Sequence, residues 1–156
     1  QVVLAQETHV LGIKMAEASK WFKAKGWKSI FAEAIPGLRP PYSSAGVAIL
    51  VRDDPAIGLG KVPGGSPTLI RGRLVAGLVS MQGTPPFVVY SAYFHVSEGL
   101  TERNMQILQA VAEDAARHGM PWILGADFNM PPKAIIDSGF LPKARAVLMH
   151  SDEALG

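Results

Sequence analysis

Asp127 and Asn129 stand at the end of a short apolar run, Trp122-Ile123-Leu124-Gly125-Ala126. Prolines on either side bound this run, which predicts a buried strand. Because side chains alternate along a strand, we expect Asp127 and Asn129 on one face and Phe128 in the opposite layer. A carboxylate beside a carboxamide can orient a water, hold a divalent cation or hydrogen-bond a phosphate oxygen. The alternative is that both residues only begin the following turn, as Asp and Asn often do.

A second acidic residue, Glu7, follows another short apolar run. Val2-Val3-Leu4-Ala5 predicts a strand, and Gln6-Glu7-Thr8-His9 comes directly after it, before a helical pattern begins. Open α/β folds place their ligands at one end of a sheet, where several strands terminate. Two strands that each end in acidic or amide side chains therefore predict one site to which both Glu7 and Asp127 contribute.

The motif Gln6-Glu7-Thr8, followed much later by Gly125-Ala126-Asp127-Phe128-Asn129, resembles the endonuclease/exonuclease/phosphatase superfamily. This superfamily has the fold of pancreatic deoxyribonuclease and includes apurinic/apyrimidinic endonucleases and the endonuclease domains of non-LTR retrotransposons, which the motifs match best. The resemblance covers most of the chain in order. It implies an α/β fold of the α+β type, a four-layer sandwich of mixed, largely antiparallel sheets with the active site at one edge.

The resemblance implies hydrolysis of a phosphoester with one or two Mg²⁺ ions, with Mn²⁺ as a substitute. Glu7 would be the main protein ligand, since Mg²⁺ takes oxygen ligands and usually keeps several waters. Asp127 would orient or deprotonate the attacking water, and Asn129 would steady it and contact the substrate. Tyr93 would hydrogen-bond a phosphate oxygen. Zinc is not expected, because the four histidines show no recognisable spacing.

Two catalytic candidates, Tyr93 and His95, lie at the end of a predicted strand, where alternation places them on one face. Tyr93 matches the nuclease branch of the resembled family. His95 stands where those enzymes often have proline and where some phosphatase-like relatives have histidine. Either residue could instead be an ordinary packed side chain. Arg71 is the candidate for binding the substrate phosphate, although a solvated position is favoured for both Arg71 and Arg73.

The sequence departs from the family pattern at both ends. Family members begin one strand earlier, with an active-site asparagine, and end in an Asp-His pair. Here Ser151-Asp152-Glu153 has glutamate in place of that histidine and follows Asp127 too closely, so neither Asp152 nor His150 is assigned the role. The expectation is one partial domain over residues 1–156, with two unpaired sheet edges and poor cutting activity on its own.

The composition is that of an ordinary globular chain, with 48% hydrophobic and 18% charged residues. The absence of cysteine excludes disulfides and thiolate metal sites and agrees with a reducing compartment. No apolar run approaches the roughly 20 residues of a membrane helix, so no membrane association is expected. The net charge of +2 and a pI near 9.0 are compatible with a polyanionic partner without requiring one. We expect an intracellular protein, with the nucleus as one candidate compartment; the oligomeric state is left open.

Two helical patterns are predicted. Met15, Ala18 and Phe22 recur at helical spacing before Gly26, a left-handed cap. The stronger helix, 101–118, begins at Thr101 as N-cap and ends at Gly119. Its predicted apolar stripe consists of Met105, Leu108, Val111, Ala112 and Ala115.

Further strands are predicted at 27–34, 45–52, 69–80 and 87–94. The strand at 45–52 is almost wholly apolar and therefore central and covered on both faces. The strands at 69–80 and 87–94 are close enough for an antiparallel hairpin, and the Trp122 strand should neighbour them in the same sheet. Turns or loops are expected at 35–44 and 53–67, one helical turn at 133–137, and no strong pattern after residue 140.

Three functions are compatible with these observations. The first is a metal-dependent nucleic-acid endonuclease domain, acting on DNA in preference to RNA. The second is a phosphatase or phosphodiesterase on a small-molecule or lipid phosphoester, to which His95 points. The third is a catalytically inactive fragment that serves as a structural or binding unit.

Overall fold

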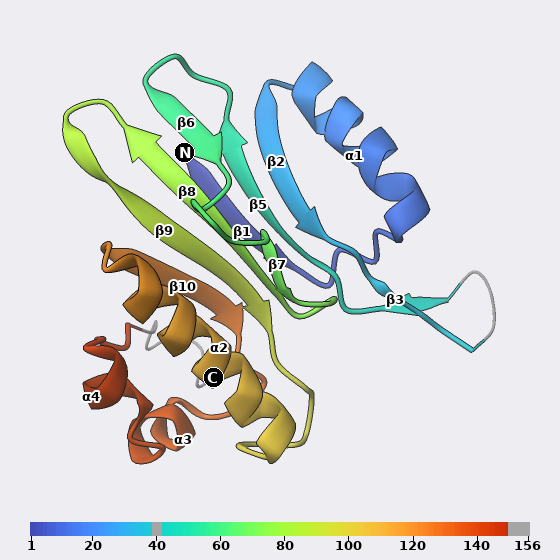
Figure 1. Cartoon of the computed structure of the whole chain (residues 1–156). Coiled ribbons are helices and arrows are strands. Elements are labelled where there is room, and N and C mark those ends of the chain that lie inside the picture. Colours follow the sequence, from blue (N-terminus) through green and yellow to red (C-terminus); the bar gives the residue numbers. More distant parts are fainter. Residues whose placement is uncertain (39–41, 150–156) are drawn as a thin grey trace.

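The computed structural model describes residues 1–38 and 42–149. Its elements in chain order are β1 (Val2–Gln6), α1 (Gly12–Ala24), β2 (Trp27–Ala32), β3 (Ile35–Pro36), β4 (Ser43–Ser44), β5 (Val47–Arg52), β6 (Ile57–Gly60), β7 (Thr68–Ile70), β8 (Leu74–Met81), β9 (Thr84–Tyr93), α2 (Glu102–His118), β10 (Trp122–Asp127), α3 (Pro132–Asp137) and α4 (Phe140–Ala144). Two sheets stack face to face, with α1 outside one and α2, α3 and α4 outside the other (Figure 1). This confirms the expected four-layer α/β sandwich.

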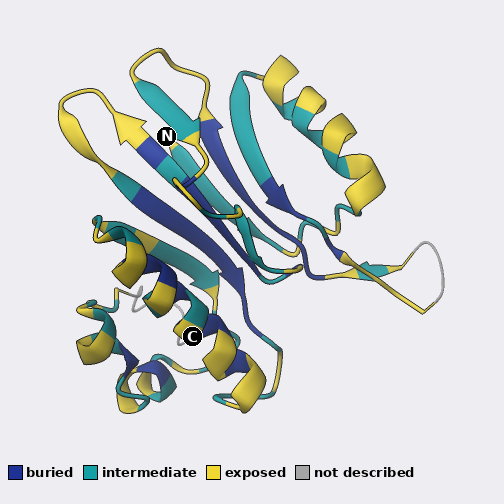
Figure 2. Ribbon diagram, in the orientation of Figure 1, coloured by how far each residue is buried: buried dark blue, intermediate teal, exposed yellow. Residues whose placement is uncertain are grey.

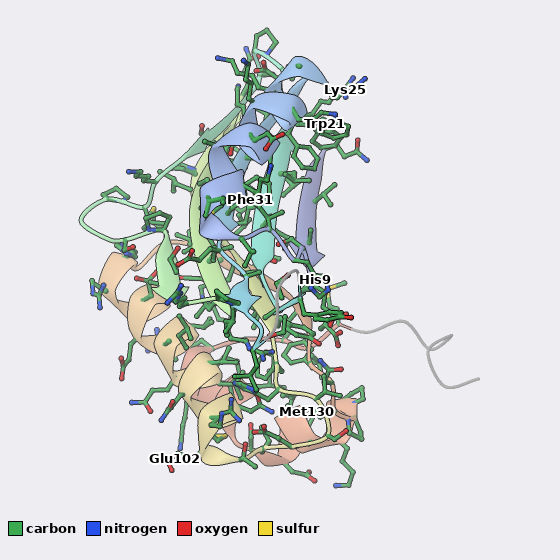
Figure 3. All side chains as sticks on the ribbon, turned by 90° about the vertical axis from the view of Figure 1, so that its right-hand side faces the viewer. His9, Trp21, Lys25, Phe31, Glu102 and Met130 are labelled. Atoms are coloured by element: carbon green, nitrogen blue, oxygen red, sulfur yellow. The ribbon has the colours of Figure 1, made fainter. Side chains whose placement is uncertain are left out.

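The smaller sheet has the strand order β1-β5-β2, and both of its pairings are antiparallel. Central β5 is buried from Val47 to Val51, as its unbroken apolar sequence predicts. On the outer face, α1 lies against β2, the strand that carries Phe31 (Figure 3). The ring centroid of Phe22 on α1 is 5.9 Å from that of Phe31. Gly26 follows this helix with φ of 78°, the predicted left-handed conformation.

The larger sheet has the order β10-β9-β8-β6, and β7 also pairs with β8. β8 and β9 form the predicted antiparallel hairpin, and β10 runs parallel to β9 after α2 crosses over the sheet (Figure 1). Side chains on β9 alternate as the pleat requires. Tyr90 and Phe94 face the helix layer, whereas Val89 and Tyr93 face the smaller sheet.

The two sheets approach closely where β1 crosses β10. A Cβ atom at Gly125 would collide with the side chain of Leu4, so glycine is needed there for the strands to lie this close. Gly125 faces β1, and Asp127, two residues further along β10, continues on that face. The packing of β1 on β10 therefore brings the end of β1 toward Asp127.

The Trp122 strand is not buried, which corrects the prediction. β10 is the edge of its sheet, and within the described residues it pairs with β9 alone. The side chain of Ile123 is 55% exposed, and much of β10 is coloured as half-buried in Figure 2. Similarly, β1 is an edge that pairs with β5 among the described residues.

Other local predictions were wrong in detail. The predicted loop 53–67 contains β6, the turn region 35–44 contains the paired strands β3 and β4, and α4 follows residue 140; residues 39–41 lie outside the described part. In α2, Met105 is 38% exposed and Ile107 is buried in its place. Thr101 is the N-cap residue, but its hydroxyl donates to Glu98 instead of capping the helix. No described helix is long and apolar enough to span a membrane.

Candidate active site

Glu7, Tyr93 and Asp127 lie together at one end of the sandwich. Tyr93 and Asp127 are register partners on the parallel strands β9 and β10. The Tyr93 hydroxyl donates a hydrogen bond of 2.5 Å to Oε1 of Glu7, which follows β1. Glu7 and Asp127 are both exposed, whereas Tyr93 is buried. The structure thus places two solvent-accessible carboxylates, distant in the sequence, around one buried phenol.

The electrostatics of Tyr93 reflect both carboxylates. The hydrogen bond to Glu7 raises the pKa of the Tyr93 phenol most, followed by burial and the charge of Glu7; Asp127 also raises it and Arg73 opposes. The phenol therefore stays protonated at neutral pH, where it can donate a hydrogen bond.

Backbone conformations at this site are unusual. Glu7 and Asn129 both have positive φ, 53° and 51°, which is uncommon for residues other than glycine. The turn after Glu7 is held by backbone bonds from Thr8 to the Gly46 carbonyl (3.0 Å) and from His9 to the Ala45 carbonyl (3.1 Å). Such conformations persist where surrounding bonds enforce them, and they occur often at functional sites.

Asn129 reaches the site differently from the prediction. β10 ends at Asp127, so strand alternation does not extend to Asn129. Instead, Asp127 begins a turn: its Oδ1 accepts a hydrogen bond from the Asn129 backbone N–H at 3.1 Å. The Asn129 side-chain amide donates to the Phe94 carbonyl at 3.1 Å, and its Oδ1 accepts no hydrogen bond within the described residues. Phe128 packs on Phe94 in the helix layer, as predicted.

A set of polar bonds between the sheets fixes β1 against the strands that carry Tyr93 and Asp127. Gln6 Nε2 donates to Ser91 Oγ at 3.1 Å and to the Gly125 carbonyl at 3.4 Å. The hydroxyl of fully buried Ser91 donates to the Ala5 carbonyl at 3.0 Å. These bonds set the position of β1 immediately before Glu7. Sequence reasoning included Gln6 in its motif but gave Ser91 no role.

His95 lies beyond the end of β9, so the predicted strand alternation with Tyr93 does not apply. Buried Asn104 of α2 holds its backbone, accepting from the His95 N–H at 2.7 Å and donating to its carbonyl at 3.1 Å. The His95 Nδ1 is 3.9 Å from Glu98 Oε1. Burial lowers the pKa of His95, and the charges of Arg73 and Arg103 lower it further. His95 therefore lies near the charged side chains of Glu98, Arg73 and Arg103. Its catalytic role stays a prediction.

Arg71 and Arg73 occupy the turn between β7 and β8, which corrects the prediction that they share a strand. Arg71 Nε is 2.8 Å from Oε1 of Glu33, and its side chain is 64% exposed. Its role in substrate binding stays a prediction. Arg73, in contrast, is half-buried, with its guanidinium carbon 4.8 Å from the centroid of the Tyr93 ring. The prediction that Arg73 occupies a solvated position was therefore wrong.

The donors of the site suit a hard cation. Glu7 and Asp127 supply carboxylate oxygens, and their exposure leaves room for the water ligands that Mg²⁺ retains. Within the described residues, no group of three or more His, Cys, Asp and Glu side chains could hold a metal ion. A zinc-type cluster of protein ligands is absent there, while a site of one or two carboxylates completed by water or substrate fits these residues. The residues 150–153 lie outside the described part.

Several solved structures have a similar fold. The catalytic domain of human Nocturnin matches with a TM-score of 0.61 and 13% identity, over 92% of this chain and 56% of that one. The endonuclease domain of TRAS1, a telomere-specific non-LTR retrotransposon, matches with 0.55 and 14%, over 93% and 70%. An endonuclease/exonuclease/phosphatase protein from Beutenbergia cavernae matches with 0.60 and 19%, over 92% and 44%.

The chain thus has the fold of endonuclease/exonuclease/phosphatase proteins, as the sequence motifs implied. It spans about half the length of the Nocturnin domain and less than half of the Beutenbergia protein. No family model matches the sequence, and no curated protein matches it.

Proposed function

We propose that this chain belongs to a divalent-metal-dependent phosphoester hydrolase and acts as the endonuclease part of a protein that cleaves DNA. The observation that carries the proposal is the convergence of Glu7 and Asp127 on Tyr93 at one open edge of the sandwich. Two carboxylates and a protonated phenol supply the cation ligand, the base and the hydrogen-bond donor that phosphoester hydrolysis uses.

Each residue has a distinct role in this proposal. Glu7 and Asp127 would hold Mg²⁺ or Mn²⁺, and the bound cation would neutralise negative charge on the phosphate oxygens. Asp127 also orients the attacking water and accepts its proton, and the Oδ1 of Asn129 aligns that water. Tyr93 donates its hydroxyl to Glu7 in the present structure. When substrate is present, the same hydroxyl donates to a phosphate oxygen.

A nucleic-acid substrate is favoured by two observations. The chain shares the fold of a retrotransposon endonuclease domain over 93% of its length. Its net charge of +2 also suits a polyanion. DNA is proposed ahead of RNA because the motifs match DNA endonucleases best. Because the chain spans about half of the Nocturnin domain, we expect slow cleavage by these residues alone.

The alternative within the same fold is a phosphatase acting on a small-molecule or lipid phosphoester. His95 supports it, since some phosphatase-like proteins have a histidine near this strand end, and ANGEL2, a 2',3'-cyclic phosphatase, has a similar fold. Release of inorganic phosphate from inositol or nucleotide monoesters, without nicking of DNA, would favour this alternative. Binding of DNA without any hydrolysis would favour an inactive binding unit.

Nicking of supercoiled plasmid in the presence of Mg²⁺ tests the proposal. Glu7→Ala and Asp127→Ala should each abolish the nicking, and EDTA should do so in the wild-type protein. Asp137→Ala is the matched control, because this exposed aspartate pairs with Lys133 on α3. Nicking that survives in both site variants, or that is lost equally in the control, would refute the proposed roles.

A further inference from the structure

Arg73 is built into the candidate site without having been assigned a function. Its carbonyl accepts the Tyr93 backbone N–H at 2.9 Å, and its guanidinium lies over the Tyr93 ring. Its Nη1 donates to the carbonyls of Tyr93 and Phe94, both at 3.4 Å. Burial lowers the pKa of Arg73, and the charge of Glu7, which binds the hydroxyl of the same phenol, is among the influences that oppose this lowering. The guanidinium is therefore held at the edge of the proposed phosphate position.

The positive charge of Arg73 is poorly compensated. Among the described residues no carboxylate lies within ion-pairing distance of it, and its buried Nε has no hydrogen-bond partner there. The two bonds from Nη1 are long for charge-assisted hydrogen bonds, which are typically about 2.7–2.9 Å. Burial is the main cause that lowers the pKa of Arg73. A half-buried guanidinium normally requires closer acceptors than these.

Neighbouring arginines show the usual compensation. Arg71 pairs with Glu33 at 2.8 Å, and Arg103 pairs with Glu98 at 2.9 Å. Both have exposed side chains, for which an ion pair contributes little. Arg73 is the more buried residue and yet lacks such a partner among the described residues. The difference leaves Arg73 without a compensating carboxylate in the described part of the chain, and a bound anion would supply that negative charge.

We propose that Arg73 binds an anionic oxygen of the substrate phosphate beside Tyr93. A guanidinium presents a planar fork of N–H donors that matches phosphate oxygens, and stacking on an aromatic ring fixes its orientation. The Nη groups provide these donors, while the buried Nε remains against the protein. This inference rests on the proposed function for the identity of the ligand, since the same position would bind any phosphoester group that reaches Tyr93.

The test measures binding of inorganic phosphate by calorimetry in the presence of Mg²⁺, without any turnover. Arg73→Gln should weaken phosphate binding about tenfold or more, the range expected for losing a charge-assisted hydrogen bond. Arg73→Lys should restore part of the affinity. Arg52→Gln is the matched control, because Arg52 also lies over an aromatic ring, 5.4 Å from the Trp27 centroid, and donates to a carbonyl at 3.4 Å. The phosphate affinity of the Arg52→Gln variant should equal that of the wild-type protein.

A second measurement separates binding from a purely structural role. In plasmid nicking, Arg73→Lys should raise KM more than it lowers kcat, and its unfolding temperature should stay close to that of the wild-type protein. Phosphate affinity equal in the wild type and Arg73→Lys and Arg73→Gln variants would overturn the inference, as would no phosphate binding by the wild-type protein. If nicking is absent but phosphate binding depends on Arg73, the proposed function fails and this inference stands.

Discussion

Strand β9 carries two tyrosines that each donate a hydrogen bond to a carboxylate. Tyr90 donates to Asp114 Oδ2 at 3.0 Å beneath α2, and Tyr93 donates to Glu7 Oε1 at 2.5 Å between the ends of the sheets. Asp114 is 3% exposed, whereas Glu7 is exposed. Burial raises the pKa of Tyr90 most, followed by the hydrogen bond to Asp114, whereas the hydrogen bond to Glu7 raises the pKa of Tyr93 most, followed by burial. The same chemical pair thus occurs in a closed and in an open environment.

The difference shows how position in the fold separates an enclosed pair from one that is open to a ligand. Asp114 is further surrounded by Arg117 and His118 of the same helix, each with a nitrogen 3.4 Å from Oδ1. These contacts enclose the carboxylate, so the pair can only fasten α2 to β9. Glu7 is open to solvent and lies at the strand ends with Asp127, so the second pair can exchange its partner for a cation or a phosphate.

Removing each carboxylate should give the largest contrast. Asp114→Ala leaves the Tyr90 hydroxyl buried without its acceptor and should lower the free energy of unfolding by about 1–3 kcal/mol. Glu7→Ala should change it by less than about 1 kcal/mol, because the site is open to water, yet abolish Mg²⁺-dependent nicking. Urea unfolding and nicking assays on both variants check this. Equal destabilisation by the two variants would contradict the assignment of separate roles.

Removing each hydroxyl should give a smaller contrast of the same kind. Tyr93→Phe should slow hydrolysis by roughly 10- to 100-fold, the effect of losing one hydrogen bond to a charged oxygen. Tyr90→Phe should leave the rate of properly folded protein unchanged and lower the unfolding temperature. Rates normalised to the folded fraction measured by circular dichroism compare the two. A rate loss in Tyr90→Phe as large as that in Tyr93→Phe would refute the distinction.

The bonds between the sheets should have an intermediate effect on both properties. Ser91→Ala removes the donor to the Ala5 carbonyl and the acceptor of Gln6, inside a fully buried contact. We expect a loss of about 1 kcal/mol in the free energy of unfolding and weaker binding of Mg²⁺, because Glu7 loses its fixed position. Metal affinity equal to that of the wild-type protein would show that these bonds stabilise the fold without positioning the site.

The smallest predicted effect concerns pH. Burial and the charges of Arg73 and Arg103 lower the pKa of His95 below its ordinary value of 6.5, so the unfolded chain binds a proton more readily. The contribution of neutral His95 to stability is complete above pH 6.5 and is lost as the pH falls through the lowered folded value. His95→Gln should therefore flatten the decline in stability below pH 6.5. An unchanged decline, followed by urea midpoints, would show that other groups cause it.

The sequence predicted the elements whose patterns are unambiguous. The apolar runs of β1, β5 and β10 and the capped pattern of α2 were found because local periodicity determines them. β6 was missed because its sequence, Ile57-Gly58-Leu59-Gly60, has low strand propensity and is held by pairing with β8. Exposure of β10 was missed because an edge strand is defined by its neighbours and not by its own residues.

The candidate site was predicted where motifs mark it. The expected convergence of Glu7, Tyr93 and Asp127 is present, since these residues belong to short motifs at strand ends, and their roles stay predictions. Arg73 was assigned to a solvated face because the turn at Gly72, with φ of 69°, was read as part of one long strand. Its contact with Tyr93 depends on the pairing of β8 with β9, which no local pattern encodes.

Binding of Mg²⁺ measured by calorimetry tests the central claim most directly, since it needs no substrate and no turnover. We expect the wild-type protein to bind Mg²⁺. Glu7→Gln and Asp127→Asn should each weaken this binding at least tenfold, and Asp137→Asn should leave it unchanged. Equal Mg²⁺ affinity in the wild-type protein and in both site variants would contradict the claim that Glu7 and Asp127 share a cation.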